Sequence, residues 1–178
     1  MLYKLPIKNL LEREKVNQLK EIIIHSLNQI PGKVINIDFS DIEYVNASGI
    51  DELFRFLISQ QQSHSINKYF YLTLPINKYE HAFNIHQALL PDLCVVASVE
   101  GEFRVLGGIS KVHKKILEMV YSQKELTSNE LSRKLGIKLN LAATHLLRLY
   151  EMKLVMREEH NLIEKNGRGR FYLYRSLF

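Results

Sequence analysis

The sequence predicts an α/β unit followed by a small helical unit that ends in a β-hairpin. Over residues 1–100, short apolar segments rich in β-branched residues alternate with segments in which apolar residues recur at helical spacing. Residues 110–178 instead show three helical patterns in succession and then two strand patterns. The charge divides in the same way, because residues 1–108 carry 10 Lys and Arg against 12 Asp and Glu, a net of −2, whereas residues 109–178 carry 14 against 7, a net of +7. We therefore expect two domains, 1–100 and 110–178, joined by a linker at 101–109.

In the first unit, each element follows from apolar spacing and from the residues that interrupt it. We expect strands at residues 2–7, 34–39, 69–74 and 93–99, and helices at residues 10–27, 50–58 and 77–90. Pro6 suits an edge strand, because proline lacks the N–H that a central strand donates. The pair Pro31-Gly32 should end the first helix. Strands that alternate with helices in this way are typical of an α/β sandwich with its helices packed on the sheet.

One segment of this unit resembles a known family. Lys33–Leu57 (KVINIDFSDIEYVNASGIDELFRFL) resembles the central segment of STAS domains, the fold of bacterial anti-sigma factor antagonists. As in that family, an apolar strand ends in an aspartate, Asp38, and a short polar turn, Asn46-Ala-Ser-Gly49, opens a helix. In the family, the serine before the glycine is phosphorylated by a partner kinase. The resemblance therefore implies a phosphorylation or partner-docking site at Ser48, together with Asn46.

Two interpretations of this turn remain open. A phosphate on Ser48 would meet the N–H groups and the dipole at a helix N-terminus, which favour negative charge. Alternatively, Asn46 or Ser48 only caps the helix, as such residues commonly do, and Gly49 relieves crowding.

The second unit has clearer boundaries. Thr127 followed by Glu130 is a capping box, and Gly136 should end the helix that the box begins. The pair Asn166-Gly167 is a typical hairpin turn. We expect helices at residues 112–120, 128–135 and 139–152, and strands at residues 154–159 and 169–174.

Glu130–Glu158 resembles, without a gap, the helix-turn-helix of winged-helix transcriptional regulators of the arsenical-repressor and multiple-antibiotic-resistance kind. The resemblance implies that residues 110–178 form three helices plus a β-hairpin wing. Its third helix would enter the major groove of DNA, and the basic tip of the wing would follow the phosphate backbone. The candidate DNA contacts are Ser132, Arg133, Lys138, Asn140, Thr144, Arg148, Lys165, Arg168 and Arg170.

Other residues of this unit depart from the family or extend its pattern. Leu139 and Leu141 stand where the family has Ser, Thr or Pro, and Leu147 is apolar on the outward side of the third helix. Such a surface would suit a winged helix that binds a protein or dimerises. In the wing, strand alternation predicts that Tyr172 and Tyr174 continue the face of the two arginines, with Phe171 and Leu173 turned to the core.

No pattern typical of an enzyme, a cofactor site or a metal site is found. Ser48 lacks the glycine two residues earlier that a nucleophile elbow needs, and there is no P-loop. His81 and His86 are five residues apart and would diverge on a helix, while His145 is expected to pack beside the core. The single cysteine, Cys94, cannot form an internal disulfide. With no basic leader and no apolar run of about 18 residues, we expect a cytoplasmic protein without a membrane contact.

We therefore expect a DNA-binding transcriptional regulator that binds double-stranded DNA as a homodimer, with the STAS-like unit as its docking, sensing or dimerising module. The alternative is a partner-switching adaptor, which binds regulatory proteins through both units and does not bind DNA. A third hypothesis is that the STAS-like unit holds a nucleotide or small ligand that tunes the winged helix.

Overall fold

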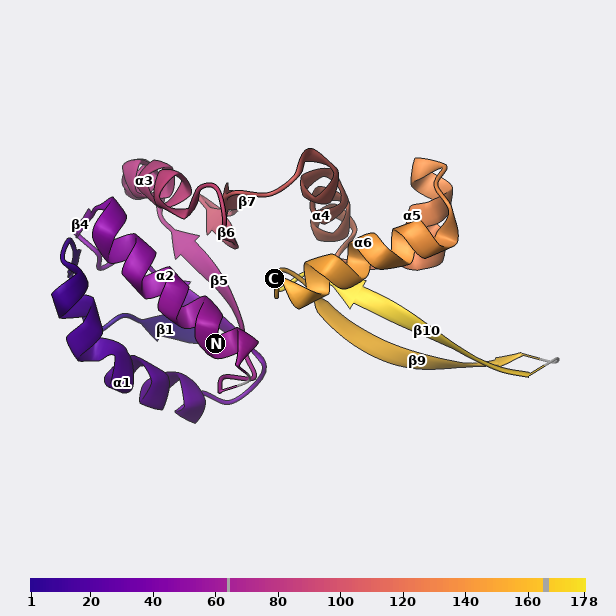
Figure 1. The fold of residues 1–178 in the computed structure, drawn as a ribbon, viewed down its shortest axis with the longest axis horizontal. Helices are drawn as coiled ribbons and strands as arrows, with labels where there is room; N and C mark the ends of the chain where they lie inside the picture. Colours follow the sequence, from indigo (N-terminus) through magenta and orange to yellow (C-terminus); the bar gives the residue numbers. More distant parts are fainter. Residues whose placement is uncertain (64, 165–166) are drawn as a thin grey trace. The chain divides into compact units, whose positions relative to one another are not determined.

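The computed structural model describes residues 1–63, 65–164 and 167–178, and the side chains of residue 76 and of residues 162–169 are not part of that description. The chain divides into two compact units, Met1–Ile109 (unit 1) and Ser110–Phe178 (unit 2) (Figure 1). The prediction of a mixed α/β fold is confirmed, since helices and a mostly parallel sheet are both present.

Unit 1 is built on a five-stranded sheet in the order β1-β3-β5-β6-β7. The strands are β1 (Leu2–Lys4), β3 (Val34–Asp38), β5 (Tyr69–Leu74), β6 (Cys94–Val99) and β7 (Glu102–Gly107). The first four run parallel, and β7 is antiparallel to β6. A separate parallel pair joins β2 (Asn9–Leu10) to β4 (Tyr44–Val45).

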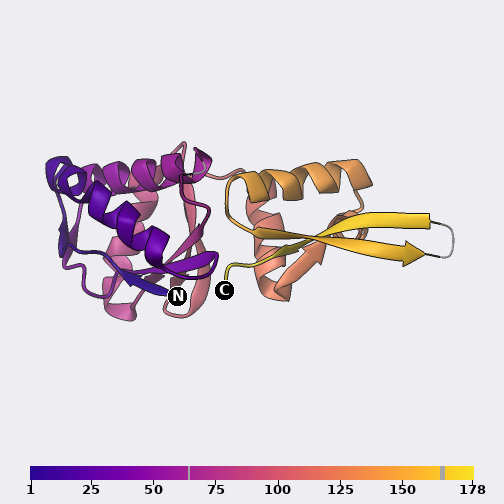
Figure 2. The same cartoon turned by 90° about the horizontal axis from the view of Figure 1, so that it is seen from below.

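The helices of unit 1 lie side by side on one face of this sheet (Figures 1 and 2). They are α1 (Arg13–Gln29), α2 (Ala47–Gln62) and α3 (Tyr79–Leu89), the last preceded by the short 3₁₀ turn η1 (Ile76–Lys78). Each links two neighbouring parallel strands and each crossover moves the same way across the sheet, so the common right-handed connection puts all three on one side. Their apolar stripes and the facing strand residues form the core of unit 1.

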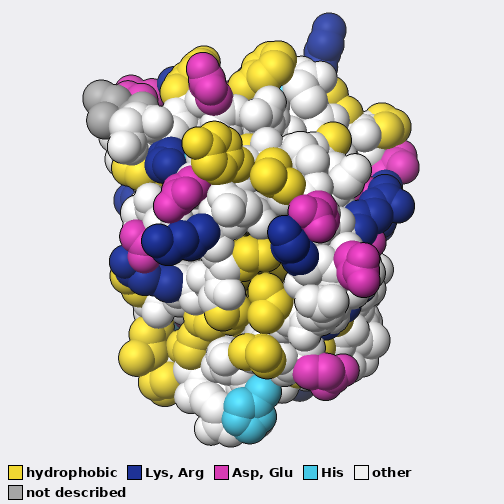
Figure 3. All heavy atoms as spheres, turned by 90° about the vertical axis from the view of Figure 1, so that its left-hand side faces the viewer, with side chains coloured by type: hydrophobic (Ala, Val, Ile, Leu, Met, Phe, Trp, Pro, Cys, Tyr) yellow, Lys and Arg dark blue, Asp and Glu magenta, His cyan; other side chains and the backbone are white. Residues whose placement is uncertain are grey.

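The end of unit 1 that lies on the left of Figure 1 carries charges of both signs, interspersed with apolar side chains (Figure 3). Several charges of unit 1 are paired, including Lys4 with Asp41 at 2.7 Å and Asp51 with both Arg13 at 3.2 Å and Arg55 at 2.6 Å. Unit 1 therefore does not offer a polyanion an unbroken cationic face on this side.

Most of the expected linker is a strand. Within residues 101–109, β7 covers Glu102–Gly107 and returns antiparallel along β6 after a turn in which Glu100 and Gly101 both have positive φ. Gly107 is needed for packing, because a Cβ there would overlap the carbonyl oxygen of Leu93. Glycines were thus a misleading sign of a linker, and only residues 108–110 connect the units without regular structure.

Unit 2 consists of α4 (Lys111–Gln123), β8 (Glu125–Thr127), α5 (Ser128–Leu135), α6 (Leu139–Glu151), β9 (Met156–Glu164) and β10 (Gly167–Arg175). Its sheet is antiparallel in the order β8-β10-β9. Strand β8 was not expected, because its three residues are too few to show a period. The core of unit 2 is built from the buried residues Ile116, Leu117, Val120, Leu126, Leu131, Ala142, Leu146, Leu149, Leu154 and Val155.

The hairpin differs from the expectation in length and register. Its strands reach Glu164 and Gly167, which pair with each other, so Gly167 is a strand residue rather than part of the turn. Leu154 and Val155, expected to begin the first strand, precede it as buried core residues.

Candidate nucleic-acid interface

Local hydrogen bonds fix the start of α5 and the turn between α5 and α6. Thr127 and Glu130 form the expected capping box: Glu130 N–H donates to the Thr127 hydroxyl at 3.3 Å, and Thr127 N–H donates to the Glu130 carboxylate at 2.8 Å. The Thr127 hydroxyl also donates to the Glu130 carboxylate at 2.8 Å. The two donors of Thr127, the backbone N–H first and the hydroxyl second, lower the pKa of the Glu130 carboxyl. Gly136 ends α5 with φ +63, a conformation that glycine adopts without strain. The Ser132 hydroxyl donates to the Ile137 carbonyl at 2.6 Å, so Ser132 braces the turn instead of pointing outward.

Helix α6 has one buried and one exposed side. Ala142, Leu146 and Leu149 are fully buried. The expected contact residues Asn140, Thr144 and Arg148 are exposed, as are Lys138 at the N-cap of α6 and Arg133 on α5. Within this set, the Thr144 hydroxyl donates to the Asn140 carbonyl at 2.8 Å, and Arg148 lies 3.6 Å from Glu151. Both Arg148 and Glu151 are more than half exposed, so their ion pair holds the guanidinium only weakly.

Three leucines of α6 are exposed as well. Leu139, Leu141 and Leu147 have 49%, 46% and 36% of their surface exposed. At 3.6 residues per turn, Leu139 and Leu141 lie on opposite flanks of α6, so the three leucines are separate exposed apolar side chains and not one patch. Each can pack against a thymine methyl group or against another protein.

Three basic residues of the hairpin were expected to contact DNA, and the structure describes the side chain of one of them. Arg170 is exposed and pairs with Glu159 at 3.3 Å. Lys165 lies outside the described residues, and for Arg168 only the backbone is described, paired with Ile163. Tyr172 is exposed as expected, but Tyr174 is buried, because the base of the hairpin folds against the core.

A groove of about 200 Å³ in unit 2 joins these elements. Its walls come from the N-terminus of α5 (Ser128 and Asn129), the start of α6 (Leu139), and β10 (Arg170 and Tyr172). Residues more than 30 positions apart in the sequence thus meet at one surface, and no local pattern predicts their meeting.

Sequence reasoning missed the role of Arg157. Its guanidinium lies 4.3 Å from the ring centre of Tyr150 on α6 and 4.5 Å from that of Tyr172 on β10. It also hydrogen-bonds Tyr174, whose pKa is raised chiefly by burial. Arg157 therefore ties the end of α6 to the base of the hairpin. The cross-strand pairing of Arg157 with Tyr174 would have indicated it, had the register been known.

A histidine pair joins α4 to α6. The Nε2 of His113 and the Nδ1 of His145 are 3.2 Å apart, and the Nδ1 of His113 is 2.9 Å from the hydroxyl of Ser110, which caps α4. Burial lowers the pKa of His113, and the neighbouring charges of His145 and Arg148 lower it further. His145 packs beside the core as expected, but its partner, 32 residues away, was not foreseen.

In unit 1, the expected docking turn begins α2. The side-chain oxygen of Asn46 accepts the N–H of Gly49 at 3.0 Å, and its amide nitrogen donates to the Leu11 carbonyl at 2.6 Å. Asn46 is therefore the helix cap and also ties α2 to the chain beside β2. Ser48 is exposed in the first turn of α2, where a partner or a modifying enzyme can reach its hydroxyl.

The described residues contain no cluster of three or more His, Cys, Asp or Glu side chains that would hold a metal ion. Among the same residues, no helix has the length and apolar character needed to cross a bilayer. Comparison with known proteins found no matching family model, no similar curated protein and no similar solved structure.

Proposed function

We propose that this chain is a DNA-binding transcriptional regulator in which unit 2 is a winged helix that binds duplex DNA. The order helix, short strand, helix, helix, hairpin supports this, as does the pairing of β8 with β10, which continues the hairpin sheet towards the helices. In this fold α6 is the recognition helix and β9–β10 is the wing.

The observation that carries the proposal is the exposed side of α6 beside a hairpin, in a unit with a net charge of +7. Asn140 and Arg148 are exposed on α6, and Arg170 places another exposed guanidinium group on the hairpin. An amide and guanidinium groups are the donors that read base edges in the major groove and hold phosphates.

For unit 1 we propose a STAS-like module that docks a regulatory partner and supports dimerisation. Its parallel strands with helices on one face, and an Asn-capped α2 that opens with an exposed serine, support this assignment. A homodimer would let two recognition helices reach two half-sites one helical turn apart.

The test is fluorescence anisotropy of the full chain with a labelled random duplex pool at several salt concentrations. The double variant Arg148→Gln/Arg170→Gln should lower the slope of log affinity against log salt by roughly 2, because each lost phosphate contact removes about one unit. The matched control, Lys8→Gln/Lys15→Gln on exposed residues of unit 1, removes the same charge and should leave the slope within about half a unit of the wild type. If the wild type does not bind at low salt, or if the control weakens binding as much as the test variant, the proposal fails.

The exposed leucines of α6 favour one competing function, the partner-switching adaptor. In that case, Leu141→Ser/Leu147→Ser would abolish binding to a protein partner, while the wild type would show no salt-dependent DNA binding. For a DNA-binding protein, the same substitutions should leave the salt slope unchanged, since they remove no charge.

A further inference from the structure

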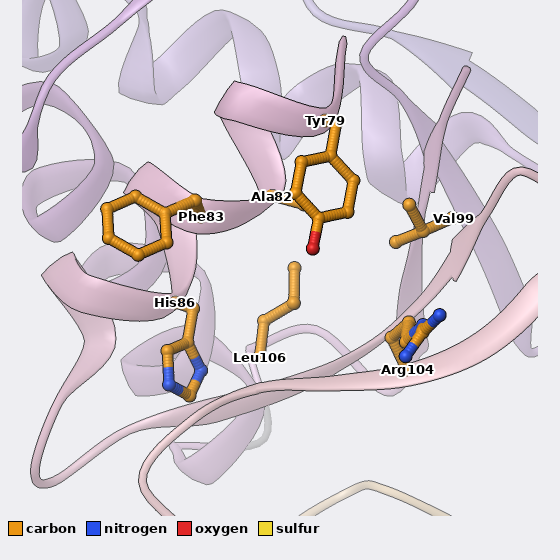
Figure 4. A pocket seen from close by; sticks show the side chains of 7 residues that line it. All are labelled: Tyr79, Ala82, Phe83, His86, Val99, Arg104 and Leu106. Atoms are coloured by element: carbon orange, nitrogen blue, oxygen red, sulfur yellow. The ribbon is translucent and has the colours of Figure 1, made fainter. Parts of the chain in front are cut away.

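Unit 1 has a small open cavity between α3 and the edge strand β7 (Figure 4). Its volume is about 170 Å³. Ala82 on α3, Val99 on β6 and Leu106 on β7 form its apolar floor, and all three are buried in the folded unit. The cavity belongs wholly to unit 1 and is separate from the proposed DNA-binding surface.

Two aromatic side chains of α3 stand at this cavity without being packed into the core. Tyr79 and Phe83 lie one helical turn apart, and 65% and 59% of their surface is exposed. An exposed phenylalanine loses the stabilisation that burying its ring would give. Contiguous exposed aromatic surface beside a cavity is typical of a binding site.

Polar groups converge on the same cavity from several elements. In Figure 4 the hydroxyl of Tyr79 points towards Leu106, and the guanidinium of Arg104 lies on β7 across from Phe83. The Nδ1 of His86 accepts the N–H of Gly107 at 2.9 Å, so the proton of the neutral ring is on Nε2, which is a donor. The polar groups at this cavity are therefore a cation and two neutral donors, with no carboxylate among the lining residues.

Arg104 is available to a ligand although it has a partner. Its Nη2 donates to Glu102 at 2.8 Å, but both side chains are more than half exposed. Exposed pairs of this kind contribute little, and a guanidinium with five N–H donors can hold a second carboxylate.

We propose that unit 1 binds a small organic anion here: an aromatic ring that lies against Tyr79 and Phe83, with a carboxylate that pairs with Arg104. The cavity volume sets the size, since it accommodates a single ring with a short acidic side chain but not a nucleotide. The Tyr79 hydroxyl would supply a further hydrogen bond to the carboxylate. A ligand at this site would give unit 1 a sensing function in addition to DNA binding. The site does not depend on the proposal that unit 2 binds DNA.

The experiment is an amide-resolved NMR titration of the full chain with three probes of the same shape: phenylacetate, phenylacetamide and phenethylammonium. Phenylacetate should bind at least tenfold more tightly than the neutral amide, and the cation should bind most weakly. The shifts should centre on the amides of α3 and on Gly107, whose N–H contacts His86.

Variants distinguish recognition of the carboxylate from nonspecific apolar binding. Arg104→Gln should weaken phenylacetate at least tenfold and leave phenylacetamide unchanged, while Arg55→Gln, which removes an exposed arginine elsewhere on unit 1, should alter neither. Phe83→Ala should weaken both probes, and because its side chain is mostly exposed, the amide spectrum of the core should remain that of the wild type.

Three results would overturn the proposal. The first is no binding of phenylacetate at millimolar concentration. The second is equal affinity for the acid and the amide, which would make the cavity a nonspecific apolar patch. The third is that the α3 and Gly107 amides shift with protein concentration instead of with the probe, which would make this face a contact between two copies of the chain.

Discussion

Replacing Gly49 by alanine should destabilise unit 1, although the same substitution usually stabilises a helix. Gly49 lies in the first turn of α2, where the helix backbone rests against the chain at β2. An added Cβ would overlap the carbonyl oxygen of Leu10 and lie 2.5 Å from its carbonyl carbon. Ordinary contact begins near 3.4 Å, so the two backbones would have to separate by about 1 Å.

The magnitude follows from what that separation breaks. Overpacking costs about 1–3 kcal/mol. The shift would also strain two bonds of Asn46, its N–H to Leu10 at 3.0 Å and its side-chain amide to Leu11 at 2.6 Å, each worth about 1 kcal/mol. The gain in helix propensity is at most about 1 kcal/mol. The free energy of unfolding of unit 1 should therefore fall by about 2–4 kcal/mol.

Hydrogen exchange measured by mass spectrometry on the full chain tests this, because it reports on the two units separately. Amides of β3 and β5 should exchange about 30- to 1,000-fold faster in Gly49→Ala, since about 1.4 kcal/mol corresponds to a factor of ten. Amides of α6 in unit 2 serve as the internal reference. Ser48→Ala, in the same turn but exposed, should change stability by less than about 0.5 kcal/mol. Slower or unchanged exchange in Gly49→Ala would refute the reasoning.

Three further predictions concern single side chains. Thr127→Ala removes the cap of α5 and should lower the free energy of unfolding of unit 2 by about 1 kcal/mol, measured by urea unfolding. Thr127→Ser keeps the hydroxyl and should retain most of the wild-type stability. Equal stability of Thr127→Ala and the wild type would contradict the capping role. Because the pKa of His113 is lowered in the folded protein, the unfolded chain binds more protons, so unit 2 should be most stable above about pH 6.5 and should lose stability as the pH falls below that value. Thermal unfolding from about pH 7.5 to 5.5 measures this loss, which should shrink in His113→Gln; an undiminished pH dependence in that variant would assign it to other groups. Burial raises the pKa of Cys94 to about 11, so its thiol should react with a disulfide reagent near neutral pH only when unit 1 unfolds, and fast modification of the native protein would show that the site is accessible.

Local signals predicted the elements whose cause is local. The alternation of apolar segments predicted β1, β3, β5, β6 and the three helices of unit 1, but not β2, β4 or β7. The capping box at Thr127 and the glycine at 136 set both ends of α5. The buried stripe of α6 follows from helical spacing alone, and so does the exposure of Asn140, Thr144 and Arg148 on its other side. These features depend on residues within one or two turns of each other, which is the range that a sequence pattern describes.

The assignments that failed depend on distant neighbours. Gly101, Gly107 and Gly108 led to the prediction of a linker at residues 101–109, but β6 has an open edge, and pairing along it satisfies the backbone of β7. Tyr174 alternates with Arg170 on its strand and still lies buried, because the base of the hairpin is covered by the core and its tip is not. Ser132 was expected to face outward, but the Ile137 carbonyl needed a donor.

The sequence by itself determined the two-unit division of charge, the α/β class, and the polar face of α6, since composition and periodicity are properties of the chain. Only the tertiary structure brought Arg157 between Tyr150 and Tyr172, paired His113 with His145, and set Arg104 beside the exposed aromatic residues of α3. Each of these groups joins residues from different elements. Their contacts depend on strand register and helix packing, which the burial of the whole core fixes and no single segment encodes.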